Sequence, residues 1–170
     1  TATVPVIETG AGVCHAYFDI DGDVEKGARI VCNAKTRRVS VCNALDCLLV
    51  HQQRTAELPA LLAPLQESGV VVHADPLTFV YLQQHDGYPK RLLRMATDDT
   101  YGTEFMDYAM ALHIVADTDD ALSHIRRFGS GHSECIITEN SQTAQQFLSS
   151  VDAACVYHNA PTSFTAGAQL

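Results

Sequence analysis

Short apolar runs separated by turn residues recur along the whole chain. Each such run predicts a β-strand, because strands of this length bury most of their side chains. The predicted strands cover residues 3–8, 13–18, 47–50, 70–72, 110–115, 135–138 and 154–157.

Between these strands, apolar residues recur every three or four positions, which is the spacing of one face of a helix. The predicted helices cover residues 24–33, 58–65, 121–128 and 144–151. Asn140 or Ser141 caps the last of them, since both side chains can accept a hydrogen bond from the first turn. Pro59 and Pro64 should shorten or bend the second helix, because proline removes a backbone donor.

The order of these elements indicates the fold class. Strands that alternate with helices of this length are typical of an α/β fold. We expect three layers, with a mainly parallel sheet flanked by helices. Residues 76–102 carry the least regular pattern, and for them we expect only a short helix and an uncertain strand.

The bulk properties restrict the class of protein. The chain has 170 residues, of which 46% are hydrophobic and 18% charged, and this is enough for one core. The net charge of −9 disfavours a nucleic-acid binder, which needs clustered Lys and Arg. No apolar run approaches the ~18 residues of a membrane helix. The chain begins with Thr1 rather than Met, so we expect a piece of a longer protein.

One of the six cysteines lies outside the apolar segments. Cys42 sits in the connection between the helix over 24–33 and the strand over 47–50, and Arg37 and Arg38 precede it. Nearby cations favour the thiolate form of a cysteine. Because structural cysteines are commoner than catalytic ones, spacing alone leaves both roles open. We expect all six thiols to be reduced and the protein to be cytoplasmic.

A family resemblance favours the catalytic role. Residues 33–44, NAKTRRVSVCNA, closely resemble the NAKTxRPSVCNA signature of gamma-glutamyl phosphate reductase, a member of the aldehyde dehydrogenase superfamily. Residues 4–10, 103–107, 128–134 and 157–165 match further family segments in the same order. Five matches in order are hard to explain by chance. The resemblance implies an aldehyde-dehydrogenase-like catalytic domain over 1–170, with the cofactor-binding domain outside this chain.

The resemblance also implies a reaction. In this family the cysteine equivalent to Cys42 attacks the acyl phosphate of gamma-glutamyl phosphate, and a thioester forms as phosphate leaves. NADPH then reduces the thioester to glutamate 5-semialdehyde, a proline precursor. Covalent catalysis of this kind divides one difficult step into two easier ones. Glu8 matches a superfamily carboxylate that would orient or tune the thiol, although a solvent-facing carboxylate is the common alternative.

Binding residues follow from the same resemblance. It places Arg38, Asn43 and Asn159 at the small-molecule substrate, and a guanidinium suits a carboxylate or a phosphate. It places Glu104 at the nicotinamide ribose of NADP, most of whose site would lie outside this chain. The full-length family implies a homo-oligomer, with glutamate kinase as a candidate upstream partner.

The sequence predicts no metal site. Cys42 and Cys47 are spaced C-x4-C, and His132 and Cys135 are spaced H-x2-C, but a zinc site needs a second convincing pair. His132 lies within the family segment G-H-S-E. A lone histidine is more often structural, and we favour that role for it.

Three positions depart from the family pattern. Val39 stands where the signature has Pro, and Ser163 and Ala166 stand where the family has Arg and Asp. The lost arginine would be a natural partner for the glutamyl carboxylate. Two alternatives therefore stay open. One is a cysteine-dependent acyl hydrolase or transferase, and the other is a degenerate domain without activity.

Overall fold

The structure, a computed structural model, describes residues 12–165. The predicted strand over 3–8, Glu8 and Ala166 lie outside the described residues. Within them, one sheet of seven strands has the order β4-β3-β5-β2-β1-β6-β7, and every neighbouring pair is parallel. The strands are β1 (Cys14–Phe18), β2 (Leu45–His51), β3 (Val71–Ala74), β4 (Leu93–Met95), β5 (Ala109–Val115), β6 (Ser133–Ile137) and β7 (Cys155–His158).

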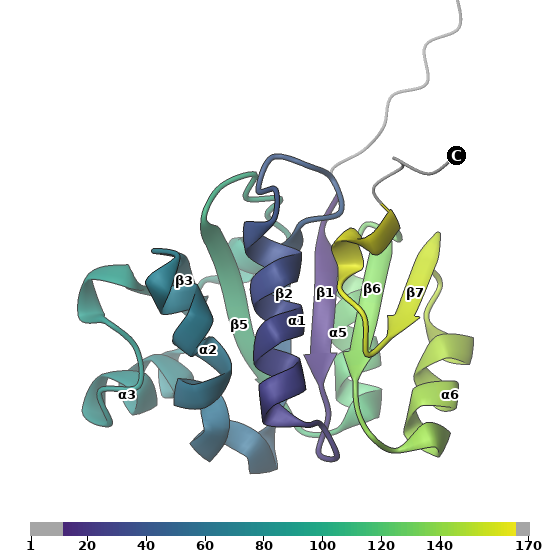
Figure 1. The fold of residues 1–170 in the computed structure, drawn as a ribbon, viewed down its shortest axis with the longest axis horizontal. Coiled ribbons are helices and arrows are strands. Elements are labelled where there is room, and N and C mark those ends of the chain that lie inside the picture. The colour runs from purple at the N-terminus through teal and green to yellow at the C-terminus, as the bar shows by residue number, and fades with distance from the viewer. Residues whose placement is uncertain (1–11, 166–170) are drawn as a thin grey trace, which may run out of the picture.

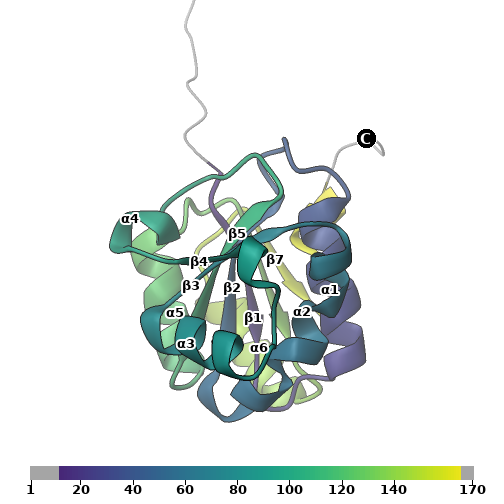
Figure 2. The ribbon, with the colours of Figure 1, turned by 90° about the vertical axis from the view of Figure 1, so that its left-hand side faces the viewer.

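Helices cover both faces of this sheet. They are α1 (Val24–Thr36), α2 (Leu58–Glu67), α3 (Pro76–Gln84), α4 (Asp98–Tyr101), α5 (Thr118–Phe128) and α6 (Ser141–Ser150). Figure 1 shows α1 and α2 in front of the sheet and α5 behind it, and the turned view in Figure 2 places them on opposite sides. The three-layer α/β fold with a parallel sheet is therefore confirmed. None of the described helices is long and apolar enough to cross a membrane.

The alternation of side chains along each strand divides the interior into two cores. Ala16 and Phe18 of β1 face the core under α1 and α2, whereas Tyr17 faces the core that contains residues of α5 and α6. All three side chains are fully buried. A parallel strand in the middle of such a sheet is covered on both faces, and this explains the nearly continuous apolar runs.

The helix ends follow local chemistry. The Asn140 side chain accepts hydrogen bonds from the backbone N–H groups of Gln142 and Thr143 and so caps α6, as predicted. Pro59 lies in the first turn of α2, where its missing N–H costs nothing. Pro64 lies inside α2 without ending it, and Gly69 terminates the turn that follows with φ +71°.

Residues 76–102 form more regular structure than their sequence suggests. They contain α3, the short edge strand β4 and the single turn α4. The apolar residues of α3 do not share one face, since Leu82 is buried whereas Leu77 and Val80 are exposed. A helix of this kind gives a weak periodic signal, which explains why the sequence indicated so little here.

Because all seven strands are parallel, their amino ends lie along one edge of the sheet. In Figure 1 this is the upper edge, where the connection between α1 and β2 passes over the sheet. Residues 129–132, which lead into β6, reach the same edge because β6 pairs with β1 next to β2. The fold thus brings two segments about 90 residues apart to one place.

Candidate active site

Cys42 lies in the connection between α1 and β2, at the amino end of β2. It is the cysteine classed as exposed among the six, whereas Cys14, Cys47 and Cys135 are buried. The backbone N–H of Ala44 donates to the Val41 carbonyl at 3.0 Å and closes a tight turn around the cysteine. The turn presents the thiol to solvent while the residues after it enter the sheet.

Gly12, which precedes β1, and Cys14, which begins it, both contact the carbonyl group of Cys42. A Cβ atom on Gly12 would lie 2.4 Å from the Cys42 carbonyl oxygen, so only glycine fits at this position. The Cys14 thiol donates to the same oxygen at 3.3 Å. Burial raises the pKa of Cys14, so this thiol stays neutral and remains a donor.

The C-terminal part of the described chain supports the next residue. The Thr162 hydroxyl donates to the Asn43 carbonyl at 3.0 Å, and the Ser133 hydroxyl donates to the Thr162 carbonyl at 2.9 Å. Both hydroxyl-bearing residues are buried. The backbone of the connection that carries Cys42 is therefore contacted by two separate parts of the chain, residues 12–14 and Thr162, and Ser133 in turn holds Thr162.

His132 stands beside the thiol. Its Nε2 atom lies 3.1 Å from Cys42 Sγ, at the amino end of β6. Gly131, with φ +71°, allows the sharp turn that aims this histidine at the connection. The sequence analysis favoured a structural role for His132, whereas the structure places its ring in contact with the Cys42 thiol. Its position within the matched segment 128–134 was the signal that could have found it.

A buried ion pair lies at the same end of the sheet. Lys35 Nζ lies 3.8 Å from Asp46 Oδ1, and both side chains are almost completely buried. Burial lowers the pKa of Lys35 and raises that of Asp46 to about 6, and each partner's charge opposes the shift of the other. Asp46 also accepts hydrogen bonds from the N–H groups of Phe105 at 3.0 Å and Cys14 at 3.5 Å.

Asp46 of this ion pair also holds the loop that carries Glu104, because it accepts the hydrogen bond from the Phe105 N–H. Glu104 is half-buried and precedes Phe105, whose N–H is held by Asp46. The carboxylates of Glu104 and Asp46 are close enough for the first to contribute to the raised pKa of the second. Glu104 therefore lies at the same edge of the sheet as Cys42.

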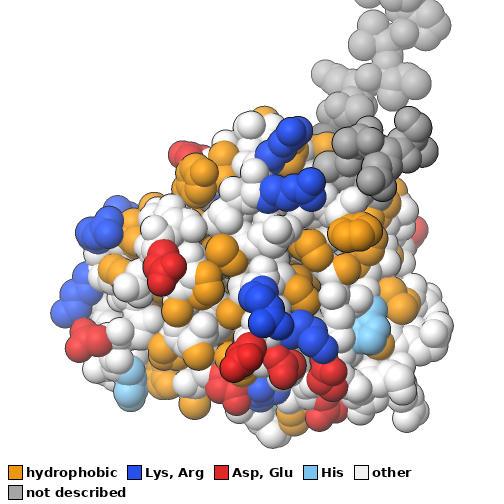
Figure 3. Space-filling view, in the orientation of Figure 1, with side chains coloured by type: hydrophobic (Ala, Val, Ile, Leu, Met, Phe, Trp, Pro, Cys, Tyr) orange, Lys and Arg blue, Asp and Glu red, His pale blue; other side chains and the backbone are white. Residues whose placement is uncertain are grey.

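The predicted substrate-binding residues are not all brought together. Arg38 is exposed on the Cys42 connection, and Figure 3 shows basic side chains gathered at this end of the molecule. Asn43 is buried, and its Oδ1 atom has no hydrogen-bond partner within residues 12–165. Asn159 lies elsewhere, because its side chain bonds the Thr138 backbone and Glu139 beyond the carboxyl end of β6.

Ser163 is buried, and its hydroxyl donates to Asn33 Oδ1 at 3.4 Å on the last turns of α1. The structure thus gives Ser163 a packing contact with the segment that leads to Cys42.

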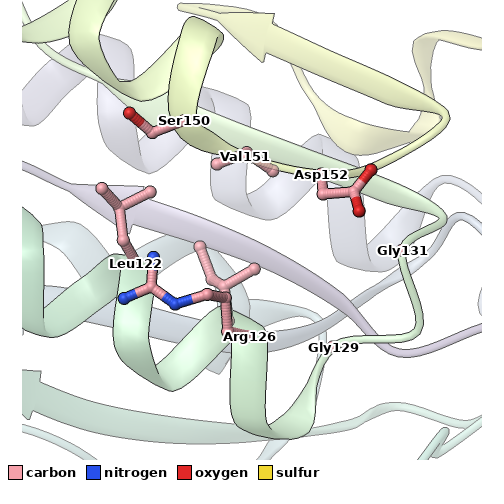
Figure 4. Close-up of a pocket in the computed structure, with 8 residues that line it drawn as sticks. Leu122, Arg126, Gly129, Gly131, Ser150, Val151 and Asp152 are labelled. Carbon is pink, nitrogen blue, oxygen red and sulfur yellow. The ribbon is translucent and has the colours of Figure 1, made fainter.

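A small cavity lies behind the segment that leads to His132. Figure 4 shows it between α5 and the end of α6, with Arg126, Gly129, Gly131 and Asp152 in its wall. Its volume is about 150 Å³. Neither Cys42 nor His132 lines it. It is separate from the Cys–His pair.

The described residues offer little to the phosphates of a dinucleotide. The turn between β1 and α1 contains one glycine, Gly22, flanked by Asp21 and Asp23. A Rossmann-type turn uses several glycines so that backbone N–H groups can approach a pyrophosphate, and carboxylates there would repel it. Among the described residues, Glu104 is the one that the family resemblance assigns to the ribose of a nicotinamide cofactor.

Comparison with known proteins identifies the relatives of this chain. No family model matches it. The gamma-glutamyl phosphate reductase of Phocaeicola vulgatus is 56% identical over 169 residues, which are 99% of this chain and 40% of that protein. The chain is a homologue of the gamma-glutamyl phosphate reductases. The Parabacteroides distasonis reductase is 54% identical over the same share of both proteins, so the chain spans about two fifths of these relatives.

Solved structures agree with this assignment. The Thermotoga maritima gamma-glutamyl phosphate reductase is 41% identical and superposes with a TM-score of 0.86 over 96% of this chain and 38% of that one. A propionaldehyde dehydrogenase from Clostridium phytofermentans (17% identity, TM-score 0.67, 91% of this chain and 42% of that one) shares the fold. So does an engineered glycolyl-CoA reductase solved with bound NADP+ (16%, 0.65, 92% and 42%). The fold is aldehyde-dehydrogenase-like.

Proposed function

We propose that this chain is the thiol-bearing domain of an enzyme that reduces gamma-glutamyl phosphate to glutamate 5-semialdehyde, a step toward proline, in the cytoplasm. One observation carries the proposal. The segment that matches the reductase signature presents an exposed Cys42 within 3.1 Å of His132. A thiol and a proton acceptor at this distance form the pair that acyl transfer requires.

The first step follows from this pair. Cys42 Sγ attacks the acyl carbon while His132 Nε2 accepts the thiol proton. The bond between the acyl carbon and the phosphate oxygen then breaks, and phosphate leaves with the electron pair. The product is a Cys42 thioester, which holds the glutamyl group at the connection. His132 can return its proton to the thiolate when the thioester is later cleaved.

A nicotinamide cofactor, NADPH in our proposal, supplies the hydride of the second step when it is bound. Glu104 is the described residue that would contact its ribose, and Asp46 holds the loop of Glu104 in place. The other binding groups would come from a cofactor-binding domain outside this chain. Glu8, which lies outside the described residues, keeps its proposed role as a carboxylate that orients the thiol.

Substrate recognition rests on fewer residues than the family pattern supplies. We propose that Arg38 attracts the carboxylate and phosphate of the substrate. The Asn43 amide oxygen is buried and has no partner within residues 12–165, and we propose that it turns toward the substrate on binding and accepts a hydrogen bond from it. Asn159 would reach the substrate only after release of its contacts with Thr138, and Ser163 offers no charge. We also propose that the full-length protein is a homo-oligomer that receives its labile substrate from glutamate kinase.

The test is selective modification of Cys42. Brief treatment of the folded chain with iodoacetamide, followed by peptide mapping, should label Cys42 before the other cysteines, since it is the exposed one. In a separate sample of unmodified chain, a nitrophenyl ester of glutamate should acylate Cys42, with one burst equivalent of nitrophenol. Cys42→Ser should lose the burst, and Cys155→Ser, which alters a half-buried cysteine, should keep it.

The fate of the acyl group distinguishes the reductase from the alternatives. A thioester that persists until a family cofactor domain and NADPH are added supports the reductase. Rapid release of free glutamate without nicotinamide would favour a thiol hydrolase, which the Cys42–His132 pair could also serve. Absence of both a burst and selective labelling would refute the nucleophile and point to an inactive domain.

A further inference from the structure

Three metal-binding side chains converge on the face of the sheet opposite α1 and α2. They are His15 of β1, Cys47 of β2 and His124 of α5, and all three are buried. One potential ligand atom from each lies within 4.8 Å of the other two. Cys47 Sγ and His124 Nε2 lie 3.7 Å apart. Polar side chains in a core can lie this close without binding an ion. The hydrogen bonds that each side chain makes or lacks therefore decide what the cluster can bind.

His15 has one ring nitrogen in use and one without a partner. Its Nδ1 atom lies 3.1 Å from Glu134 Oε2, and both side chains are fully buried. Its Nε2 atom is also buried and has no hydrogen-bond partner within residues 12–165. A histidine that donates Nδ1–H to a carboxylate and leaves Nε2 unpaired has the arrangement of a zinc ligand with its supporting carboxylate. An unpaired buried nitrogen would otherwise destabilise the fold.

The other two side chains face each other across the same space. His124 Nε2 lies 3.7 Å from Cys47 Sγ, and the His124 ring packs edge-on against the His15 ring, with the ring centroids 5.5 Å apart. Binding of a divalent metal would release the thiol proton of Cys47 to solvent, because the thiolate is the ligand.

We propose that His15 Nε2, Cys47 Sγ and His124 Nε2 bind a zinc-class divalent ion, with Glu134 as the carboxylate behind His15. Zinc accepts mixed nitrogen and sulfur ligands, with bond lengths of about 2.0–2.1 and 2.3 Å. A tetrahedral ion with those bonds separates sulfur from nitrogen by about 3.6 Å. The observed 3.7 Å between Cys47 and His124 agrees with this value. The other separations in the cluster are at most 4.8 Å and would have to shorten by up to about 1.4 Å when an ion binds.

The charges of this arrangement balance. A divalent cation adds two positive charges to the core, and the Cys47 thiolate and the Glu134 carboxylate add two negative ones. A buried ion is tolerated only when its charge is compensated in this way. No fourth ligand was found within residues 12–165, so a water molecule would complete the coordination.

The proposed site is distinct from the Cys42–His132 pair. Glu134 lies two residues after His132 on β6, but its side chain bonds His15 in the interior, whereas Cys42 is exposed. The ion would link β1, β2 and α5 and act in folding rather than in the reaction. Because the three ligands are buried, the ion must enter during folding or a large opening of the domain.

Cobalt(II) offers the most direct test, since thiolate coordination gives a charge-transfer band in the near ultraviolet. All proteins carry Cys42→Ala, so that the exposed thiol beside His132 cannot bind the probe. Each protein is unfolded with guanidinium and chelator, refolded with one equivalent of CoCl2 or ZnCl2 under reducing conditions, and desalted. Absorption spectra and metal content by mass spectrometry are then measured.

Cys47→Ser and Cys135→Ser form the matched pair. Both change a fully buried strand cysteine, but Cys135 packs in the core under α1 and α2, away from the cluster. The parent and the Cys135 variant should retain one metal per chain and show the band, and the Cys47 variant should lose the band. Glu134→Gln should weaken binding by about 10- to 100-fold, as is typical for loss of a carboxylate behind a metal-bound histidine.

Either of two results would overturn the proposal. The first is a refolded parent protein that binds no cobalt or zinc. The second is a Cys47 variant that keeps the same metal content and band as the parent. Refolding of Cys47→Ser is checked by near-ultraviolet circular dichroism. If this variant does not refold, the chain that carries only Cys42→Ala decides the test. It must then bind one equivalent of metal and show a thiolate band, and the Cys135→Ser variant must show the same band.

Discussion

Replacement of Gly12 by alanine tests how the Cys42 thiol is positioned. The added Cβ would lie 2.4 Å from the Cys42 carbonyl oxygen and 3.0 Å from the Cys42 Cβ, whereas ordinary van der Waals contact begins near 3.4 Å. The backbone at Gly12, which leads into β1, and the Cys42 peptide must therefore separate by about 1 Å. Neither side can yield as a flexible side chain would, because the obstructing oxygen belongs to the backbone.

Two effects follow from a shift of this size. Overpacking in a buried region costs about 1–3 kcal/mol of stability. Displacement of Cys42 Sγ by up to 1 Å from His132 would lengthen the 3.1 Å contact beyond hydrogen-bond reach, and a misplacement of that size lowers reaction rates by up to about 100-fold. The Cys14 thiol would also lose its acceptor, the Cys42 carbonyl oxygen.

The assay compares iodoacetamide alkylation of Cys42 and urea unfolding in the wild type, Gly12→Ala and Gly102→Ala. Gly102 is the matched control, since a Cβ there would meet only Phe128 Cδ1 at 3.9 Å. We expect slower alkylation and lower stability in the Gly12 variant alone. If Gly12→Ala is destabilised but Cys42 reacts at the wild-type rate, then β1 does not position the thiol. If both quantities are unchanged, the close approach itself is refuted.

Three other variants probe separate features. His132→Gln should slow alkylation of Cys42 at pH 7 by about tenfold or more, through loss of the proton acceptor, and an unchanged rate would reduce that contact to packing. Asn140→Ala should lower the free energy of unfolding by about 1 kcal/mol through loss of the α6 cap, and urea titration would show it. Asp46 has a pKa raised from 3.8 to about 6, so the folded state retains a proton that the unfolded chain releases. Its contribution to stability is therefore present below pH 4 and lost as the pH rises to about 6, a loss of up to about 3 kcal/mol. Wild-type stability relative to Asp46→Asn should fall over that interval, and a relative rise would contradict the burial argument.

The strands and long helices could be predicted because burial leaves a direct mark on the sequence. Phe18 and Tyr17 point to opposite faces and are both fully buried, so the apolar run over β1 has no polar interruption. The cap at Asn140 was equally visible, because capping depends on neighbouring residues. The pattern in α3 was weak because Leu77 is exposed and the apolar face is broken.

Contacts between distant segments left no such mark. His132 and Cys42 meet because β6 pairs with β1 and β1 pairs with β2, and periodicity does not reveal the order of strands in a sheet. The resemblance grouped Asn159 with the substrate ligands, but its side chain lies at the other end of β6. A motif records which residues recur together, whereas the fold decides which of them touch.

The hydrogen bond from the Thr162 hydroxyl to the Asn43 carbonyl affects where this chain can be shortened. All seven strands end by His158, so a shorter piece that stopped before Pro161 would contain the complete sheet. It would nevertheless lack the hydroxyl that holds the peptide after Cys42 and the carbonyl that Ser133 bonds. The sheet is therefore complete at His158, whereas the contacts that hold the Cys42 connection extend to Thr162. A fragment trimmed to its sheet would keep all seven strands and lose the contact that holds the connection of Cys42.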